Sequence, residues 1–249
     1  MLDKNIKEIL EKEALKRDDI GELSLQKPDP LLVAREYHDE YISLICALFA
    51  YGNASLIVKF LKSLDFFLLD KNEEEIKRSL QDRYYRFQSR EDVAEFFITL
   101  KRAKSKISLQ DLFLEGYKKE HLVMDGIREV ITFLYDINSY RSRGYEFLIG
   151  KIPQKSPKSP YKRWNMYLRW MVRKDSLDMG LWSGVDRKDL LIPLDTHTFN
   201  ISLKLGLLQR KTYDFKAVLE LTNSLKRLDP LDPVKYDFAL YRIGQEKIL

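Results

Sequence analysis

Two short segments in the C-terminal half of the chain contain side chains that can do chemistry. The first, residues 162–166 (KRWNM), begins with Lys162 and opens a predicted helix after a stretch rich in lysine, serine and proline. The second, residues 192–197 (IPLDTH), places Asp195 at the start of another predicted helix. Lysine supplies a primary amine, which can act as a nucleophile and form a Schiff base. A carboxylate can stabilise positive charge, but aspartate is also a preferred N-cap, and for Asp195 the two interpretations are compatible.

The charge of the chain is concentrated in one window that includes Lys162. The formal net charge is +5, whereas residues 151–174 carry eight basic side chains and no acidic one, so the rest of the chain sums to −3. A basic segment in a nearly neutral chain is typical of proteins that bind a polyanion such as nucleic acid, and a solvated basic loop is the alternative. Aromatic residues that can stack on bases lie between the basic ones: Tyr161, Trp164, Tyr167 and Trp170.

The arrangement of the two segments resembles the helix–hairpin–helix DNA glycosylase superfamily, which contains endonuclease III and the 8-oxoguanine glycosylases. In that superfamily a hairpin precedes a helix that starts with the catalytic lysine, and a later apolar-Asp-Thr-His segment supplies the catalytic aspartate. Lys162 and Asp195 match these two places, and Asn165 falls where endonuclease III has an asparagine. The resemblance spans about residues 40–244 and is specific only at Lys162 and Asp195. The chain also resembles a bacterial family of unknown function, which shares residues 162–172 and the Pro-Leu-Asp block.

The resemblance implies a DNA repair glycosylase that excises a damaged base, an oxidised purine being one candidate, and that has AP-lyase activity. Lys162 would attack the sugar and form a Schiff base, after which the strand breaks by β-elimination. Asp195 would stabilise the cationic character of the sugar as the base departs. Lys162 also has a simpler interpretation, because most of the eight basic residues of its window are expected to contact phosphates or to be solvated.

The expected partner is double-stranded DNA. Lys155, Lys158 and Arg163 are the candidates for phosphate contacts, because they belong to the basic window. Tyr51 lies in a helix-closing segment similar to the early helix pair whose turn inserts a residue into the duplex, so it is a further candidate for DNA binding. Trp182, on a loop between glycines, is the candidate for the base pocket.

Two features depart from the glycosylase pattern. The hairpin of that superfamily carries two glycines that let backbone amides approach a phosphate, whereas residues 152–160 contain none. Lys162 and Asp195 are 33 residues apart, a spacing longer than in endonuclease III and closer to the archaeal 8-oxoguanine branch. The missing glycines favour an alternative function, a non-catalytic DNA-binding protein on the same fold. A helical interaction scaffold is a third interpretation, and the basic window makes it the least favoured.

A second cluster of basic and aromatic residues occupies positions 83–87 (RYYRF). These side chains either pack on the first half of the chain or contact DNA. We expect them to pack, with Arg83 and Arg86 exposed.

The elements that must position these residues are predicted to be helices. Proline occurs at positions 28 and 30 and then not until 153, which leaves 122 residues free of the main helix breaker. Apolar residues recur there at helical spacing, and Ser89 and Ser108 are predicted N-caps. Residues 190–192 are the single short β-like run, and a proline ends it. The expected fold class is all-α, a helix–hairpin–helix glycosylase-like arrangement of two helical halves that flank a cleft.

The prolines also divide the chain. We expect an N-terminal segment at residues 1–29, an N-terminal helical half at 30–150 and a C-terminal half at 151–249 that carries the modified hairpin, Lys162 and Asp195. Helices are predicted in the C-terminal half at about residues 161–173, 195–205 and 214–228 and after Pro233.

Composition excludes several classes of protein. With 45% hydrophobic and 33% charged residues, the chain is too apolar to be disordered and too evenly charged for a membrane protein, and its first residues do not form a signal peptide, so the cytoplasm is the expected location. Its single cysteine, Cys46, rules out an internal disulfide, a cysteine-based zinc site and an iron–sulfur cluster held by one chain. The three histidines form no spaced ligand set. We therefore expect no metal, no cofactor and a monomer.

Overall fold

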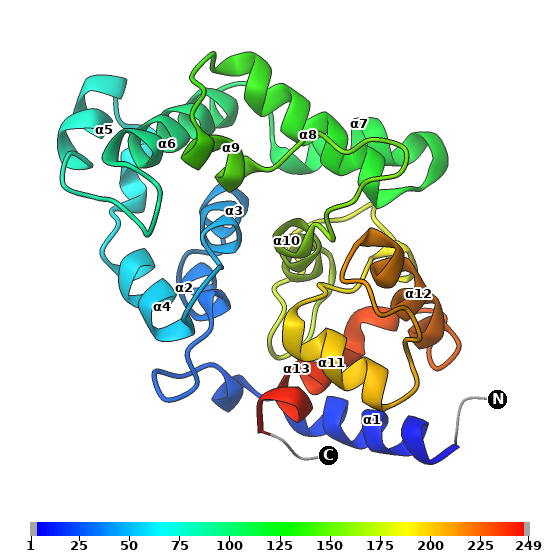
Figure 1. Cartoon of the computed structure of the whole chain (residues 1–249). Helices are drawn as coiled ribbons and strands as arrows, with labels where there is room; N and C mark the ends of the chain where they lie inside the picture. Colours follow the sequence, from blue (N-terminus) through cyan, green and yellow to red (C-terminus); the bar gives the residue numbers. More distant parts are fainter. Residues whose placement is uncertain (1–3, 247–249) are drawn as a thin grey trace. The chain divides into compact units, whose positions relative to one another are not determined.

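The computed structural model describes residues 4–246, and in that range the chain folds into helices with no strand (Figure 1). The prediction of an all-α fold is therefore confirmed. The segment at residues 190–192 is irregular, and β pairing in the described range is limited to two isolated bridges. The chain forms two compact units: a central unit, Ser24–Pro153, and a terminal unit that combines Met1–Leu23 with Gln154–Leu249.

The central unit contains eight α-helices and one short 3-10 helix in the described chain. Its 3-10 helix is η2 (Phe66–Asp70). Its α-helices are α2 (Pro30–Tyr37), α3 (Glu40–Leu48), α4 (Ala54–Lys62), α5 (Glu73–Ser79), α6 (Arg90–Lys104), α7 (Leu109–Glu120), α8 (Val123–Ile137) and α9 (Arg143–Ile149). The helix α2 packs against α3 and α4, and α6 packs against α5, α8 and α9.

Serine side chains start two of these helices, as the sequence predicts. The Ser89 hydroxyl accepts a hydrogen bond from the amide of Asp92 at 3.1 Å, and the Asp92 carboxylate accepts one from the amide of Ser89 at 2.7 Å. This reciprocal pair forms a capping box at the start of α6. At the start of α7, the Ser108 hydroxyl accepts from the amide of Asp111 at 3.0 Å.

The helices α7 and α8 pack closely because two glycines face the partner helix. A Cβ added at Gly116 of α7 would lie 2.7 Å from the carbonyl carbon of Asp125 in α8. A Cβ added at Gly126 of α8 would lie within 2.7 Å of the buried ring of Phe113 in α7. The absence of both side chains therefore sets the distance between the two helices.

The terminal unit joins the two ends of the chain. It contains the short 3-10 helices η1 (Ile20–Glu22), η3 (Arg187–Asp189) and η4 (Pro233–Tyr236). Its α-helices are α1 (Lys4–Arg17), α10 (Lys162–Val172), α11 (Thr196–Lys204), α12 (Phe215–Lys226) and α13 (Asp237–Glu246). The helix α11 packs on α13, α1 packs on α13 and η4, and α12 packs on η4. The helix α10 is buried from Trp164 to Val172.

A buried arginine attaches the N-terminal helix α1 to the C-terminal helix α13. Arg17 is 3% exposed, and its guanidinium donates to Glu22 at 3.0 Å and to both carboxylate oxygens of Glu246 at 3.0 and 2.8 Å. Arg242 of α13 also pairs with Glu22, at 3.0 Å. A buried charge is stable only when it is paired, so these contacts fix α1 within the terminal unit.

None of the helices between residues 4 and 246 is both long enough and apolar enough to span a bilayer.

We predict that Gly116→Ala destabilises the protein, although alanine is ordinarily the better helix former by about 1 kcal/mol. The added Cβ would meet the backbone of Asp125, which cannot move without separating α7 from α8. The expected loss is about 1 to 3 kcal/mol in the free energy of unfolding, measured by urea denaturation. Lys118→Ala, on the exposed face of the same helix, is the control and should change stability by less than about 0.5 kcal/mol. A Gly116→Ala protein as stable as the wild type would contradict the close packing.

Candidate functional site

Lys162 is the first residue of α10, where an irregular segment turns into helix. Tyr161, just before it, has a left-handed backbone with φ of 47°, which is costly for a residue other than glycine. Asn165 holds this turn, because its Nδ2 donates to the carbonyl of Pro160 at 3.1 Å. The Lys162 side chain is half-buried, and its Nζ lies 3.2 Å from Sδ of Met166. A thioether is a weak acceptor, so this contact orients the amine without neutralising its charge.

The segment at residues 152–160, which the resemblance predicts to replace the hairpin, has no regular secondary structure. It is attached to the start of α12, because the amide of Phe215 donates to the carbonyl of Lys158 at 3.2 Å. Lys155 and Lys158 are exposed on this segment. Their charged side chains are available for contact with an anion from solvent.

Asp195 is the N-cap of α11. Its Oδ1 accepts a hydrogen bond from the amide of Thr198 at 2.7 Å, so the capping interpretation is confirmed. Its Oδ2 has no hydrogen-bond partner among residues 4–246, and the side chain is only half-buried. Capping therefore uses one oxygen of this carboxylate and leaves the other for a second role.

Lys162 and Asp195 both act electrostatically on the same buried group, the carboxylate of Asp237. Asp237 is the first residue of α13 and pairs with the guanidinium of Arg169 in the middle of α10. Burial raises the pKa of Asp237 to about 6; Asp195 adds to this rise, while Arg169 and Lys162 oppose it. Lys162 at the start of α10 and Asp195 at the start of α11 are thus each within electrostatic range of Asp237 at the start of α13.

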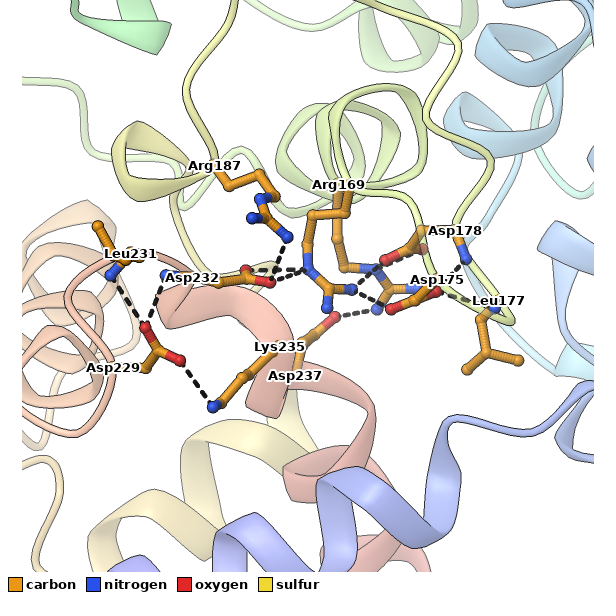
Figure 2. Close-up of polar contacts among 11 residues, drawn as sticks. Arg169, Asp175, Leu177, Asp178, Arg187, Asp229, Leu231, Asp232, Lys235 and Asp237 are labelled. Carbon is orange, nitrogen blue, oxygen red and sulfur yellow. Dashed lines mark hydrogen bonds and ion pairs between the residues drawn. The ribbon is translucent and has the colours of Figure 1, made fainter.

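Arg169 belongs to a buried network of arginines and aspartates that Figure 2 shows. Its Nε donates to Oδ1 of Asp178 at 3.1 Å, in the loop that follows α10. Arg173, one helical turn later, donates through Nε to both oxygens of Asp232 at 3.0 and 3.1 Å. Its Nη1 donates to Asp175 at 2.7 Å and also to Asp178. Arg169 of α10 and Arg173, the C-cap of this helix, therefore hold the loop after α10 on one side and the start of η4 and α13 on the other.

Acidic groups outnumber basic ones in the interior of this network. Four carboxylates, those of Asp175, Asp178, Asp232 and Asp237, surround the two buried guanidiniums. Arg187 reaches Asp232 at 3.7 Å, but its side chain is 54% exposed. Burial also raises the pKa of Asp178. The network therefore favours a proton on one of its buried carboxyl groups as the pH falls.

The network corrects the interpretation of the basic window. Arg169 and Arg173 contribute to its count of eight basic residues, but both are buried and paired with aspartates. They are structural charges and cannot contact a polyanion. Lys155, Lys158 and Lys174 are exposed, and Arg163 is half-buried, so the surface charge of this region is smaller than the sequence count indicates.

A cavity of about 230 Å³ opens beside the network in the terminal unit. Its wall includes Arg169, Arg173 and Asp178 together with Arg17 of α1 and Lys235 of η4. None of the candidate residues from the sequence lines it. Charged and apolar side chains both line it, and Trp182, the candidate for the base pocket, is not among them.

The two aromatic candidates are packed. Trp182 is 6% exposed, its ring contacts that of Tyr167 edge-on at 5.4 Å, and its amide donates to Met171 at 2.8 Å. Tyr51, in the central unit, is half-buried, and its hydroxyl donates to Oε1 of Gln88. Their rings therefore belong to clusters of side chains and do not project alone.

The described residues include no group of three or more His, Cys, Asp or Glu side chains arranged to hold a metal ion. Cys46 is buried in α3. Its burial raises the pKa of the thiol, which makes it an inert core residue.

Sequence reasoning missed Arg169, Asp178 and Asp237 as a unit. A signal was present, because Arg169 and Arg173 are spaced i, i+4 with only apolar residues between them, which places both on one face. Buried arginines require acidic partners, and Asp175 and Asp178 follow three and six residues after the end of α10. Asp237 had no such signal, because it lies 68 residues away along the chain.

We predict that Asp237→Asn changes how stability depends on pH. The pKa of this carboxyl rises from about 4 in the unfolded chain to about 6 in the folded protein, so the folded state binds the proton more tightly. Its contribution is present below pH 4 and is lost as the pH rises through 6. Asparagine cannot titrate, so the unfolding free energy of the variant, minus that of the wild type, should increase by about 1 to 3 kcal/mol between pH 4 and 6. Urea denaturation across this range measures the difference, and a constant difference would contradict the assignment.

Comparison with known proteins supplies a family for the chain. No curated protein and no solved structure matches it. A family model described as "Protein of unknown function (DUF2400)" matches residues 29–246. Because this match spans most of the chain, the protein belongs to the DUF2400 family.

Proposed function

We propose that the protein is a DNA glycosylase with AP-lyase activity that uses Lys162 as its nucleophile and Asp195 as the electrostatic partner. One observation carries the proposal: a lysine and an aspartate, each at the start of a helix, both act on the buried carboxylate of Asp237. The resemblance to the helix–hairpin–helix glycosylases assigns the same two residues. We further propose that it acts as a monomer in the cytoplasm, where a buried single cysteine is in keeping with a reducing environment.

The proposed reaction uses the amine of Lys162 in its unprotonated form. The amine attacks C1′ of the damaged nucleotide, the bond between C1′ and the base breaks, and the base leaves with its bonding electrons and takes up a proton. Opening of the sugar ring gives a Schiff base between Nζ and C1′. A proton is then lost from C2′ and the bond from C3′ to the phosphate oxygen breaks, which cleaves the strand.

Asp195 is suited to stabilise the positive charge that builds on the sugar while the base departs. Its Oδ1 is committed to the amide of Thr198, which orients the carboxylate, and its Oδ2 is not so committed within the described chain. A carboxylate held in place before the reaction stabilises charge without reorganisation. Arg169 supports this arrangement indirectly by fixing the start of α13 to α10 through Asp237.

DNA binding is supported by basic residues of the terminal unit, of which Lys155 and Lys158 are exposed and Arg163 is half-buried. Lys155 and Lys158 lie on the segment that leads into Lys162, and Arg163 follows it. These charges are suited to contact phosphates near the nucleophile, in place of the glycine-based grip of the superfamily.

We predict that duplex DNA binds with a steep dependence on salt. Each phosphate contact contributes a slope of about −0.9 in log affinity against log salt. The triple variant Lys155→Gln, Lys158→Gln, Arg163→Gln should flatten this slope by about 2 to 3, measured by fluorescence anisotropy. A charge-matched control replaces three exposed lysines of α1 by glutamine: Lys4, Lys7 and Lys12. Equal slopes for the two triple variants would remove these residues from the DNA interface.

We predict that borohydride traps the wild-type protein covalently on an oligonucleotide with an abasic site or a damaged base. Lys162→Arg should abolish trapping and keep DNA binding, because a guanidinium retains the charge but cannot form a Schiff base. Lys158→Ala is the control, because Lys158 is the next candidate amine on the same segment, and it should still be trapped. Full trapping of Lys162→Arg would assign the amine elsewhere. Binding by the wild type without trapping on 8-oxoguanine, uracil, alkylpurine or abasic substrates would favour the non-catalytic DNA-binding alternative.

We predict that Asp195→Asn keeps the fold and loses the chemistry. Asparagine is as good an N-cap as aspartate, so the melting temperature should change little. Loss of the charge should lower base excision by about 100-fold to 1,000-fold in single-turnover assays, the scale for one electrostatic partner of the transition state. An unchanged excision rate would leave Asp195 with the role of a cap alone.

A further inference from the structure

The central unit carries exposed aromatic side chains that lie outside its buried core. Tyr84, Phe87 and Phe147 are 64%, 52% and 41% exposed, and they come from the turn before α6 and from α9. The rings of Phe87 and Phe147 are 4.6 Å apart and edge-on. Tyr51 contacts both, with ring centroids 5.6 and 5.0 Å away, and is half-buried. We call Tyr51, Phe87 and Phe147 the aromatic face.

The aromatic face is held rigidly by hydrogen bonds from Gln88, which is 1% exposed. Its amide donates to the carbonyl of Tyr85 at 2.9 Å, which closes the turn that carries Phe87. Its Nε2 donates to the carbonyl of Gly144 in α9 at 3.1 Å, and its Oε1 accepts from the hydroxyl of Tyr51. One buried glutamine therefore connects the three segments that present the rings. The fold already orders these side chains, so ligand binding does not have to pay the conformational entropy of ordering them.

Arginines without acidic partners accompany the rings. Arg83, Arg86 and Arg90 lie on the turn and at the start of α6, and Arg143 lies one helical turn before Phe147 in α9. All four are exposed, and none forms an ion pair with a residue in the range 4–246. No acidic residue lies between Arg83 and Arg90; Asp82 and Glu91 flank this segment, and Glu146 lies between Arg143 and Phe147 in α9.

Arg86, beside the rings, has an uncommon backbone conformation. Arg86 has a left-handed backbone with φ of 55°. Its guanidinium lies 5.6 Å from the centroid of the Tyr51 ring, and it covers Gly52, whose φ of +104° a residue with a side chain rarely adopts. A conformation that costs energy is retained where the surrounding structure requires it, and here its result is a cation directly beside exposed rings.

We infer that the aromatic face binds unpaired bases of single-stranded DNA, with bases stacking on Phe87 and Phe147 and with the four arginines on the phosphates. Exposed rings beside uncompensated cations form the combination that binds single strands, because every base has a π-face and every nucleotide carries a negative charge. The positive charge, which has no acidic partner in the described chain, favours a polyanion over a protein partner. The choice of DNA over RNA rests on the proposed function. The surface lies in the central unit and contains none of the residues proposed for the chemistry.

The expectation that residues 83–87 pack, with Arg83 and Arg86 exposed, is correct for Tyr85 and wrong for Tyr84 and Phe87. Tyr85 does pack, since it is 6% exposed and its hydroxyl donates to the carbonyl of Tyr51 at 2.9 Å. Tyr84 and Phe87, on either side of it, face solvent.

The test compares the full-length wild type with the double variant Phe87→Leu, Phe147→Leu for binding to a fluorescein-labelled 15-mer of thymidine at low salt. Leucine keeps an apolar side chain and removes the ring, so affinity should fall at least tenfold while the melting temperature is retained. Phe67→Leu is the matched control, because Phe67 is a 68% exposed phenylalanine of the same unit, and it should bind as the wild type does. Equal affinity of the double variant and the wild type would overturn the inference. So would a change in oligomeric state of the double variant in sedimentation velocity without a loss of DNA binding.

A second measurement uses the unmodified protein. A single-stranded oligonucleotide that contains 5-iododeoxyuridine should crosslink under ultraviolet light to Phe87 or Phe147, and crosslinks confined to other residues would overturn the inference. Tighter binding of a 15-mer of uridine than of the thymidine strand would overturn the choice of DNA. Borohydride trapping on an abasic site separates this inference from the proposed function. Failure of trapping with retained, ring-dependent strand binding contradicts only the glycosylase, and successful trapping by a double variant with undiminished strand binding contradicts only the aromatic face.

Discussion

The pairing of Arg169 with Asp178 and Asp237 is the interaction on which the terminal unit depends. One guanidinium in the middle of a buried helix holds the loop that follows this helix and the first residue of the last helix. Removing one partner of a buried pair leaves a charge without compensation and costs about 3 to 5 kcal/mol. Because α11 packs on α13, this pairing also fixes where Asp195 lies relative to the start of α10. The positions of Lys162 and Asp195 therefore depend on how the buried charges of the terminal unit are paired.

The same network explains why the pKa of Asp237, a carboxyl group within electrostatic range of Lys162, is raised. Two buried guanidiniums cannot compensate four carboxylates, and burial penalises the charges that remain. The pKa of Asp237 rises to about 6 despite its contact with Arg169. Groups with strongly shifted pKa values occur often at functional sites, although structural ion pairs shift them as well. Asp237 fits both descriptions. It forms a structural ion pair with Arg169 of α10, and it lies within electrostatic range of Lys162, the proposed nucleophile.

Local signals in the sequence predicted much of the fold. Ser89 and Ser108 cap their helices, and Asp195 caps α11, because the spacing of a cap from its amide is short and fixed. The long interval without proline is helical as expected. The site residues Lys162 and Asp195 were singled out by resemblance, and their electrostatic link through Asp237 emerges only from the fold.

Contacts between residues far apart in the sequence could not be predicted from local patterns. Arg169 and Asp237 are 68 residues apart and share no periodic pattern. The basic window ends at Lys174, one residue before the acidic group that neutralises part of it, so a linear count overestimated the surface charge. The exposure of Phe87 was equally hidden, because the side that a short turn presents to solvent depends on the hydrogen bonds of Gln88. Composition predicted an excess of basic residues in this region, and only packing shows which of them are exposed.

The most direct measurement of the central claim is the site of covalent attachment in the unmodified protein. The wild type would be trapped with borohydride on an abasic oligonucleotide, digested, and analysed by tandem mass spectrometry for the lysine that carries the reduced sugar adduct. The account predicts a single modified residue, Lys162, at the start of α10. An adduct on Lys155, Lys158 or another lysine, or adducts spread over several exposed lysines, would contradict it.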